Sequence, residues 1–237
     1  NCRMYTILKT DSDSGNPSGT LDPNRCWKVF NLENSKYFSA IGFFFAKELY
    51  KGQNVPVGII VAAQGGSGIN EWLTEETVKA TGFTSGLAGT SRCATRVEPD
   101  SRVRTRGVLW YQGETDGFSG QGQTYYQNAL PLLINQWREK QENPNYPVLL
   151  MSFPQSVSYD ASEGRYPAIR EAQEVVAKTV ANVVKVPAID LGSSHTEGFG
   201  KCLHPDDKDE AGRRCYLAAR NLVYGETSFR YRCPQPA

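Results

Sequence analysis

The chain has 237 residues, enough for one large α/β domain with a substantial buried core. Its 26 basic and 25 acidic residues leave a formal net charge of +1, so no long-range field favours nucleic acid or an acidic membrane surface. The longest apolar run, near residues 57–63, is far shorter than the ~20 residues that cross a bilayer.

Cysteine usage bears on where the protein functions. The count of six is even, and no Cys-x-x-Cys pair suggests a zinc site. We therefore expect a disulfide-containing protein that is secreted or lumenal (extracellular or lysosomal), with the pairing left open. Buried free thiols in a cytosolic enzyme are the alternative. The first residues, NCRMYTILK, contain no signal peptide, as expected of a trimmed secreted chain or of an intracellular one. The cysteines are Cys2, Cys26, Cys93, Cys202, Cys215 and Cys233.

The first part of the chain is predicted to contain two strands and a helix. Residues 2–8 form a short strand, and an irregular loop rich in Asp, Ser, Gly, Asn and Pro follows over 9–25. Ser39 can cap a helix whose apolar side chains share one face and which Gly52 ends. The continuous run VGIIVAA at 57–63 is typical of a strand covered on both faces.

Strands and helices continue to alternate after an irregular stretch at 81–106. Apolar runs predict the strands, and a periodicity near 3.6 residues predicts the helices between them. The last helix begins at Asp206 and Asp207, whose carboxylates suit a helix N-terminus, and it stops at Gly225. The predicted strands are 107–111, 147–153 and 183–190, and the predicted helices are 123–140, 167–180 and 206–224.

This alternation predicts a mostly parallel sheet with helices on both faces, within a single domain over residues 1–237. In such sheets, ligands bind beyond the carboxyl ends of the strands. We expect three strand ends to share one rim, because each runs into polar sequence. These ends are Gln64-Gly65-Gly66-Ser67, Gln112-Gly113-Glu114 and Asp190.

The first two strand ends offer groups with a chemical use. Gly65 and Gly66 let the backbone approach a ligand and point N–H groups at an anion, although the absent lysine excludes a P-loop. The Gln112 amide can stabilise developing negative charge, and Glu114 can orient a neighbour or bind a sugar hydroxyl. A plain tight turn at the glycines, and a polar turn at the other two, are the structural alternatives.

His204 is the candidate general base, since a hydrolytic site in this architecture requires a histidine. It stands at the entrance of the last helix and is better placed than His195, the other histidine. No carboxylate precedes it by two or three residues, so an orienting acid would come from elsewhere, such as Asp190 or Asp206. A metal site built from the histidines, Asp190 and Cys202 matches no standard ligand set, so we expect no metal and no cofactor.

Three segments together resemble the sialate O-acetylesterase branch of the SGNH-type carbohydrate esterases. They are VPVGIIVAAQGGSGINEWL (55–73), RGVLWYQGETD (106–116) and LHPDDKDEAGRRCYLAARNLVYGE (203–226), in the order and spacing of that family. The resemblance implies a flavodoxin-like, three-layer α/β/α sandwich with a mostly parallel central sheet. It also implies an enzyme that removes acetyl groups from sugar hydroxyls.

The resemblance also assigns roles. In this family a serine attacks the ester carbonyl, a histidine takes the serine proton, and a glycine N–H together with a Gln or Asn amide holds the oxyanion. Carried over to this chain, the base is His204, and the oxyanion donors are Gly65 or Gly66 together with Gln112.

One element of the family pattern is absent from this sequence: the Gly-Gln-Ser-Asn block that ends the first strand and carries the nucleophile. Ser67 and Ser156 are the nearest imitations, and neither matches its position. The serine can lie on a companion chain, lie on a part of a longer chain that is not in this sequence, or be missing from an inactive family member. Loss of an interior strand would leave its neighbours with unpaired backbone groups, so we expect another segment to fill its place.

Two functions follow. The first is a serine-type carbohydrate O-acetylesterase that acts on an acetylated glycan or sugar, with the nucleophile supplied by a companion segment outside this chain. The second is a catalytically inactive secreted family member that serves as a glycan-binding or structural module. Retention of the glycine pair, Gln112, Glu114 and His204 favours the first. Neither function involves nucleic acid or a membrane.

Overall fold

A computed structural model describes residues 1–7, 27–80, 93, 104–119, 122–155, 165–192, 204 and 207–229. Several residues singled out from the sequence lie outside these ranges, namely Cys26, Ser156, His195, Cys202, Asp206 and Cys233.

The amino-terminal part of the chain forms a small sheet in the order β2-β1-β3. Its strands are β1 (Cys2–Thr6), β2 (Lys28–Val29) and β3 (Val57–Val61). β1 and β3 are parallel, with Met4 opposite Ile59, whereas the short β2 pairs with β1 in the antiparallel sense.

A second sheet, in the order β4-β5-β6, is parallel throughout. Its strands are β4 (Val108–Trp110), β5 (Val148–Met151) and β6 (Val183–Val186). The strands predicted at 107–111, 147–153 and 183–190 are thus present, each somewhat shorter than expected.

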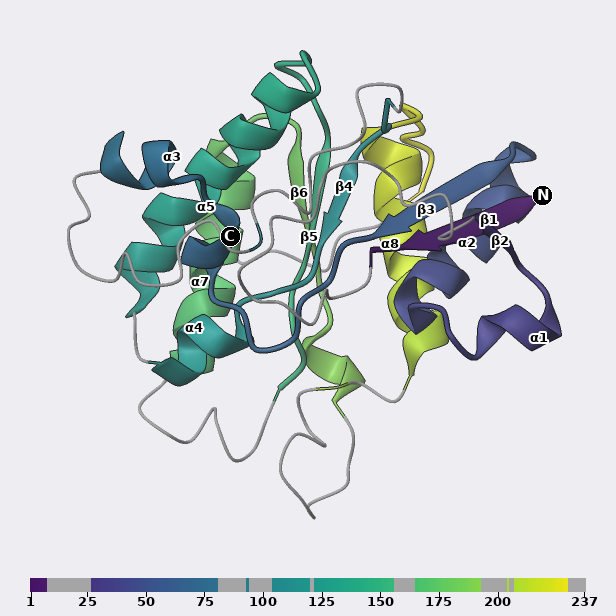
Figure 1. Cartoon of the computed structure of the whole chain (residues 1–237), viewed down its shortest axis with the longest axis horizontal. Helices are drawn as coiled ribbons and strands as arrows, with labels where there is room; N and C mark the ends of the chain where they lie inside the picture. The colour runs from purple at the N-terminus through teal and green to yellow at the C-terminus, as the bar shows by residue number, and fades with distance from the viewer. Residues whose placement is uncertain are drawn as a thin grey trace.

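Two pairs of helices cover the sheets. α2 (Ala40–Gln53) packs on α8 (Lys208–Leu222), and α5 (Gly122–Lys140) packs on α7 (Arg165–Thr179). Alternate residues of β5 enter different cores: Val148 and Leu150 join the α5/α7 side, while Leu149 and Met151 join the α2/α8 side. Figure 1 shows β4, β5 and β6 between α5 and α7 on the left and α8 on the right. Helices on both faces of parallel strands confirm the predicted α/β/α fold class.

The predicted end of the helix that Ser39 caps, which is α2 in the structure, is wrong by about two residues. α2 continues through Gly52 to Gln53, and Asn54 provides the left-handed cap with φ of 52°. Gly52 serves packing instead, because a Cβ placed there would lie 1.6 Å from the hydroxyl oxygen of Tyr216 on α8. The glycine permits close approach of the two helices.

Several short elements were not predicted from the sequence. They are too brief to carry a periodic apolar signal, and tertiary contacts decide them. These elements are α1 (Leu32–Ser35), η1 (Ile69–Trp72), α3 (Glu75–Ala80), α4 (Glu114–Ser119) and η3 (Ile189–Leu191).

The two sheets are not joined to each other by strand pairing within the described ranges, and β3 and β4 are the strands that end them on the facing sides. Ile59, Ile60 and Val61 are only partly buried, as are Val108 and Leu109, whereas all four residues of β5 are buried. The apolar run at 57–63 therefore has the composition of an interior strand, but among the described residues only one strand lies beside it.

Two cysteines bear on the predicted disulfides. Cys2 and Cys215 are buried free thiols, and Cys2 Sγ contacts the carbonyl of Ala46 at 3.6 Å. Burial raises the pKa of Cys215 to about 12, which keeps this thiol protonated and unreactive. For Cys2 and Cys215, therefore, the structure shows buried free thiols and not the predicted disulfides. None of the helices within the described ranges is long and apolar enough to cross a membrane.

Candidate functional site

A cavity of about 800 Å³ lies between β3 and β4, and we call it the central cavity. Its walls come from both strands, and it reaches α2 and α8 on one side of the sheets and Trp72 and Trp137 on the other. The lining includes every residue predicted to form the site: Gly65, Gly66, Gln112, Glu114 and His204.

The glycine turn lies just beyond the carboxyl end of β3. Gly66 has φ of +72°, a conformation that strains other residues, and both glycines are exposed. A Cβ at Gly65 or Gly66 would meet no atom within 4 Å, so a ligand has open access to this stretch of backbone. The turn therefore presents main chain to the central cavity.

Gln112, just after β4, is buried and firmly held. Its backbone carbonyl oxygen accepts hydrogen bonds from the Tyr126 hydroxyl at 3.0 Å and from Gln173 Nε2 at 3.1 Å. Its own Nε2 donates to the Ser67 carbonyl at 2.9 Å and to Asp116 Oδ2 at 2.5 Å. Both amide hydrogens thus have acceptors in this arrangement, whereas the buried Oε1 has no partner among the described residues.

Asp116 is a buried carboxylate that the sequence did not single out. Besides Gln112, it accepts the backbone N–H of Ile69 at 3.1 Å, so it links the segments after β3 and β4. Burial raises the pKa of Asp116 to about 6; the bonds from Gln112 and Ile69 oppose that rise, and the nearby Glu114 carboxylate adds to it. Burial likewise raises the pKa of Glu114, the first residue of α4.

Ser67 has a structural role here. Its hydroxyl donates to the Gln64 carbonyl at 2.8 Å and accepts the indole N–H of Trp72 at 3.0 Å. Because the hydroxyl proton is already committed to a carbonyl, Ser67 is not positioned as a nucleophile. This agrees with its mismatch to the expected nucleophile position.

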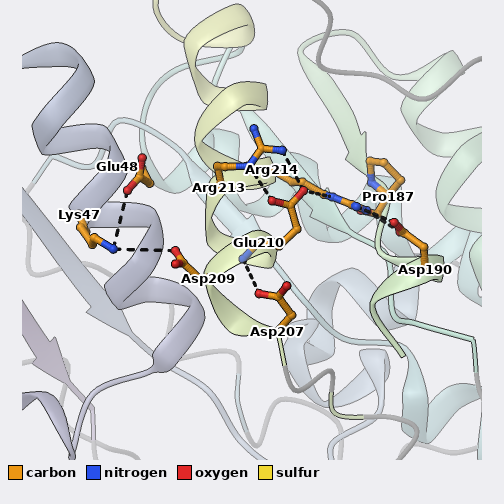
Figure 2. A network of polar contacts seen from close by, with 9 residues as sticks. All are labelled: Lys47, Glu48, Pro187, Asp190, Asp207, Asp209, Glu210, Arg213 and Arg214. Atoms are coloured by element: carbon orange, nitrogen blue, oxygen red, sulfur yellow. Dashed lines mark hydrogen bonds and ion pairs between the residues drawn. The ribbon is translucent and has the colours of Figure 1, made fainter. Parts of the chain in front are cut away.

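His204 precedes the capping residue of α8 by three positions. Asp207 caps this helix by accepting the N–H of Glu210 at 2.8 Å, and Glu210 accepts from Arg214 Nε at 2.8 Å. Arg214 also binds both carboxylate oxygens of Asp190 at 2.6 Å, which ties the first turns of α8 to η3 (Figure 2). These contacts fix the start of the helix that follows His204.

The same contacts bear on a minor possibility raised by the sequence, that Asp190 orients His204. Hydrogen bonding to Arg214 lowers the pKa of Asp190 and engages both its oxygens, so Asp190 does not orient His204 in this arrangement. Among the residues that the structure describes, no group of three His, Cys, Asp or Glu side chains is placed to hold a metal ion.

The sequence thus predicted five residues that line the central cavity, but it did not predict the buried polar bonds behind them. Asp116 stands four residues after Gln112, one turn onward in α4, and this spacing is the available signal. This signal is weak, since the sequence GETD at 113–116 equally suits an exposed turn. The Tyr126 and Gln173 contacts come from α5 and α7 and need the tertiary fold to be known.

Comparison with known proteins places the chain in a family. A model described as "Carbohydrate esterase, sialic acid-specific acetylesterase" matches residues 30–204, well over half of the chain. The chain belongs to this family.

Similar family proteins include curated sialate O-acetylesterases from Homo sapiens and Pongo abelii. Each is 29% identical over 224 residues, which cover 85% of this chain and 42% of the relative. A Mus musculus sialate O-acetylesterase is 26% identical, with 86% and 46% covered. The chain therefore spans a little under half the length of these curated relatives.

Solved structures agree. A carbohydrate acetylesterase from Xanthomonas citri superposes with a TM-score of 0.76 at 28% identity, covering 95% of this chain and 50% of that one. An Arabidopsis thaliana protein shares the fold, with a TM-score of 0.59 at 20% identity and 94% and 80% covered. These matches confirm the resemblance to SGNH-type carbohydrate esterases.

Proposed function

We propose that this chain carries most of the active site of a serine-type carbohydrate O-acetylesterase similar to the sialate O-acetylesterases. The observation that carries the proposal is that Gly65, Gly66, Gln112, Glu114 and His204 all line one cavity. Family membership supplies the reaction class. The nucleophilic serine lies on a segment outside these 237 residues, and the chain forms a single domain that lacks its first strand.

In the proposed reaction these groups take the roles that the family resemblance assigns to them. The serine oxygen attacks the acetyl carbonyl carbon, and His204 takes the hydroxyl proton. The resulting oxyanion is held by a backbone N–H of the glycine turn. His204 then returns the proton to the departing sugar oxygen, leaving an acetyl-serine. Water, deprotonated by His204, attacks this ester and releases acetate and the free serine.

Gln112 completes the oxyanion site only if it changes partners. Both of its amide hydrogens are bound to Ser67 and Asp116, so one must be released toward the substrate oxygen. Protonation of Asp116 weakens its bond with Gln112 and favours that release, and its pKa of about 6 makes this accessible in mildly acidic solution.

The occupied Gln112 amide is also the observation that favours the second function. A family member that binds acetylated glycans without hydrolysing them would need no free oxyanion donor. In that case Glu114 and the exposed glycine backbone would bind sugar hydroxyls, and His204 would have no role in chemistry.

The substrate class rests on the relatives, whose names specify acetylated sialic acids or carbohydrates. We propose an O-acetylated sugar as the substrate of this chain. We also propose a secreted or lumenal location, which the buried thiols Cys2 and Cys215 do not themselves support. No cofactor is required, because serine, histidine and backbone N–H groups suffice for ester hydrolysis.

Acetate release from an O-acetylated sialic acid tests the proposal. We expect the natural protein to hydrolyse the ester and the His204→Ala variant to lose at least about a thousandfold in kcat. Gln112→Ala should lose on the order of 10²-fold. Binding of the sugar without hydrolysis, unchanged by His204→Ala, would establish the second function instead.

A further inference from the structure

We propose that Arg214 is a positioning residue for the reaction described above. It joins η3 to the first turns of α8 and thereby holds His204 at the central cavity. The role of His204 as a base rests on the proposed function, whereas the contacts of Arg214 are independent of that function.

Arg214 binds groups from two parts of the chain at once. Its Nη1 and Nη2 donate to the two carboxylate oxygens of Asp190 at 2.6 Å each, and Nη1 also donates to the Pro187 carbonyl at 3.0 Å. Its Nε donates to Glu210, one turn earlier in α8, at 2.8 Å. Figure 2 shows these contacts on the two sides of the guanidinium. All three nitrogens are used, and the side chain is only 19% exposed.

The pair of Arg214 and Asp190 is bidentate, with a planar guanidinium facing both carboxylate oxygens. The pairing lowers the pKa of Asp190 and raises the pKa of Arg214, so both groups stay charged at neutral pH. A lysine would keep the positive charge but lose the planar fork that reaches η3 and Glu210 together. The connection therefore depends on arginine specifically.

Both elements that Arg214 joins are fixed to the body of the fold. Pro187 and Asp190 closely follow β6, which pairs with the buried strand β5. α8 packs closely on α2, because a Cβ added at Gly212 would lie 2.6 Å from the Cβ of Phe44. Arg214 thus links two well-packed parts of the molecule, and each part helps to place the other.

His204 lies in the chain between these two parts. It precedes Asp207 by three positions, and Asp207 holds the start of α8 by accepting the N–H groups of Glu210 at 2.8 Å and Ala211 at 3.3 Å. His204 is exposed although it lines the central cavity, so packing of its own side chain does little to fix the ring. The position of the ring therefore depends on the backbone, which α8 holds directly and η3 holds through Arg214.

Asp190 contributes to this arrangement without contacting the imidazole. A carboxylate that orients a catalytic histidine ordinarily accepts the ring N–H. Here both oxygens of Asp190 face Arg214, so its influence on His204 passes through the guanidinium. Arg214 and Asp190 should therefore act as one unit.

Arg213 provides a matched control, since it is the neighbouring residue of the same helix and binds the same glutamate. Its Nε and Nη2 donate to Glu210 at 2.6 Å and 2.9 Å, and its side chain is 49% exposed. Within the described ranges it has no hydrogen bond to η3. Arg213→Lys therefore removes a guanidinium from α8 without releasing η3.

Acetate release by the natural protein and its variants tests the proposal. We expect Arg214→Lys to lower kcat by on the order of 10- to 100-fold, because a displaced base loses its catalytic geometry, and to leave KM within about twofold. Arg213→Lys should keep kcat within about twofold, as expected of an exposed ion pair. Each kcat is measured well below the unfolding midpoint of the variant, so that a change in stability alone does not lower it.

Asp190→Asn breaks the same contact from the η3 side and leaves α8 unchanged, so it replaces Arg214→Lys if that variant folds poorly. It should lower kcat by about tenfold, and the double variant should be no slower than Arg214→Lys alone, since the two residues act as a unit. Equal kcat for Arg214→Lys and Arg213→Lys, or additive losses in the double variant, would overturn the proposal.

A measurement on His204 that needs no reaction separates this proposal from the proposed function. With isotope-labelled histidine, the ring signal of His204 in the NMR spectrum is identified by its absence from His204→Gln. We expect one narrow signal in the parent and in Arg213→Lys, and a broadened or split signal in Arg214→Lys, as exchange between ring positions predicts.

The two proposals can therefore fail separately. If the natural protein hydrolyses no ester, the proposed function fails, while broadening confined to Arg214→Lys still supports the positioning role. An unchanged His204 signal in Arg214→Lys overturns that role, whether or not the protein is an esterase.

Discussion

At the scale of single residues, the most informative side chain is Asp116, because it is an acid buried behind the site. Burial raises its pKa from an ordinary 3.8 to about 6. A carboxyl group with a raised pKa in the folded state favours folding while protonated. That stability is present below pH 3.8 and is lost as the pH rises through 6.

Asp116→Asn should therefore gain stability relative to the parent as the pH rises. Between about pH 4 and pH 7.5, the difference in free energy of unfolding between D116N and the parent should shift by roughly 2–3 kcal/mol in favour of D116N. Urea unfolding at both pH values measures it. The exposed Asp209 on α8 provides the control, since D209N should show a much smaller shift. An equal advantage of D116N at both pH values would contradict the raised pKa.

Among the described residues near the site, Gly66 and Gly113 have positive φ, and of these two only Gly113 is packed against other residues. A Cβ at Gly113 (φ 134°) would lie 2.8 Å from Ile169 and 3.0 Å from Phe153, whereas one at Gly66 (φ 72°) would meet nothing within 4 Å. We expect Gly66→Ala to cost about 1 kcal/mol from backbone strain alone, and Gly113→Ala to cost about 3 kcal/mol or more. Thermal unfolding of the two variants side by side tests this, and similar losses would show that packing at Gly113 is loose.

The sequence predicted Gln112 as a site residue because it directly follows an apolar strand. It did not predict that both hydrogens of the side-chain amide would already be bound. Their acceptors are the Ser67 carbonyl and the Asp116 carboxylate, which only the folded chain brings close to Gln112. Local patterns report where a side chain emerges. They do not report the partners that tertiary structure brings to it.

At the scale of elements, α2 and α8 show where local signals fail. Gly52 suggested a helix end, but Asn54 caps α2 and Gly52 makes room for Tyr216. A glycine is equally suited to a cap and to close packing of helices, and the sequence does not distinguish these uses. The start of α8 was predictable, because Asp207 caps it as its sequence position suggests.

The packing role of Gly52 gives a prediction. In an ordinary helix position, Gly→Ala stabilises by up to about 1 kcal/mol. Gly52→Ala should instead destabilise by roughly 2 kcal/mol, because its Cβ would overlap the Tyr216 hydroxyl. In a Tyr216→Phe background the same change should cost clearly less. Urea unfolding of this double-mutant cycle measures the coupling, and additive effects would refute the contact.

At the scale of the whole molecule, the alternation of strands and helices predicted the fold class correctly. The apolar run VGIIVAA also predicted an interior strand. In the part of the chain that the structure describes, this strand has β1 on one side and the central cavity on the other. Alternation identifies layers but does not specify which strands pair. The split between the sheets therefore became visible only in three dimensions (Figure 1).

The central claim is that a serine outside these 237 residues reacts in the central cavity, with His204 as its base. A fluorophosphonate probe tests it most directly, since an activated serine oxygen displaces fluoride and bonds to phosphorus. After labelling of the natural protein, peptide mass spectrometry should find the phosphonyl group on a serine outside residues 1–237, and His204→Ala should abolish labelling. A labelled serine within residues 1–237, or labelling that persists without His204, would contradict the account.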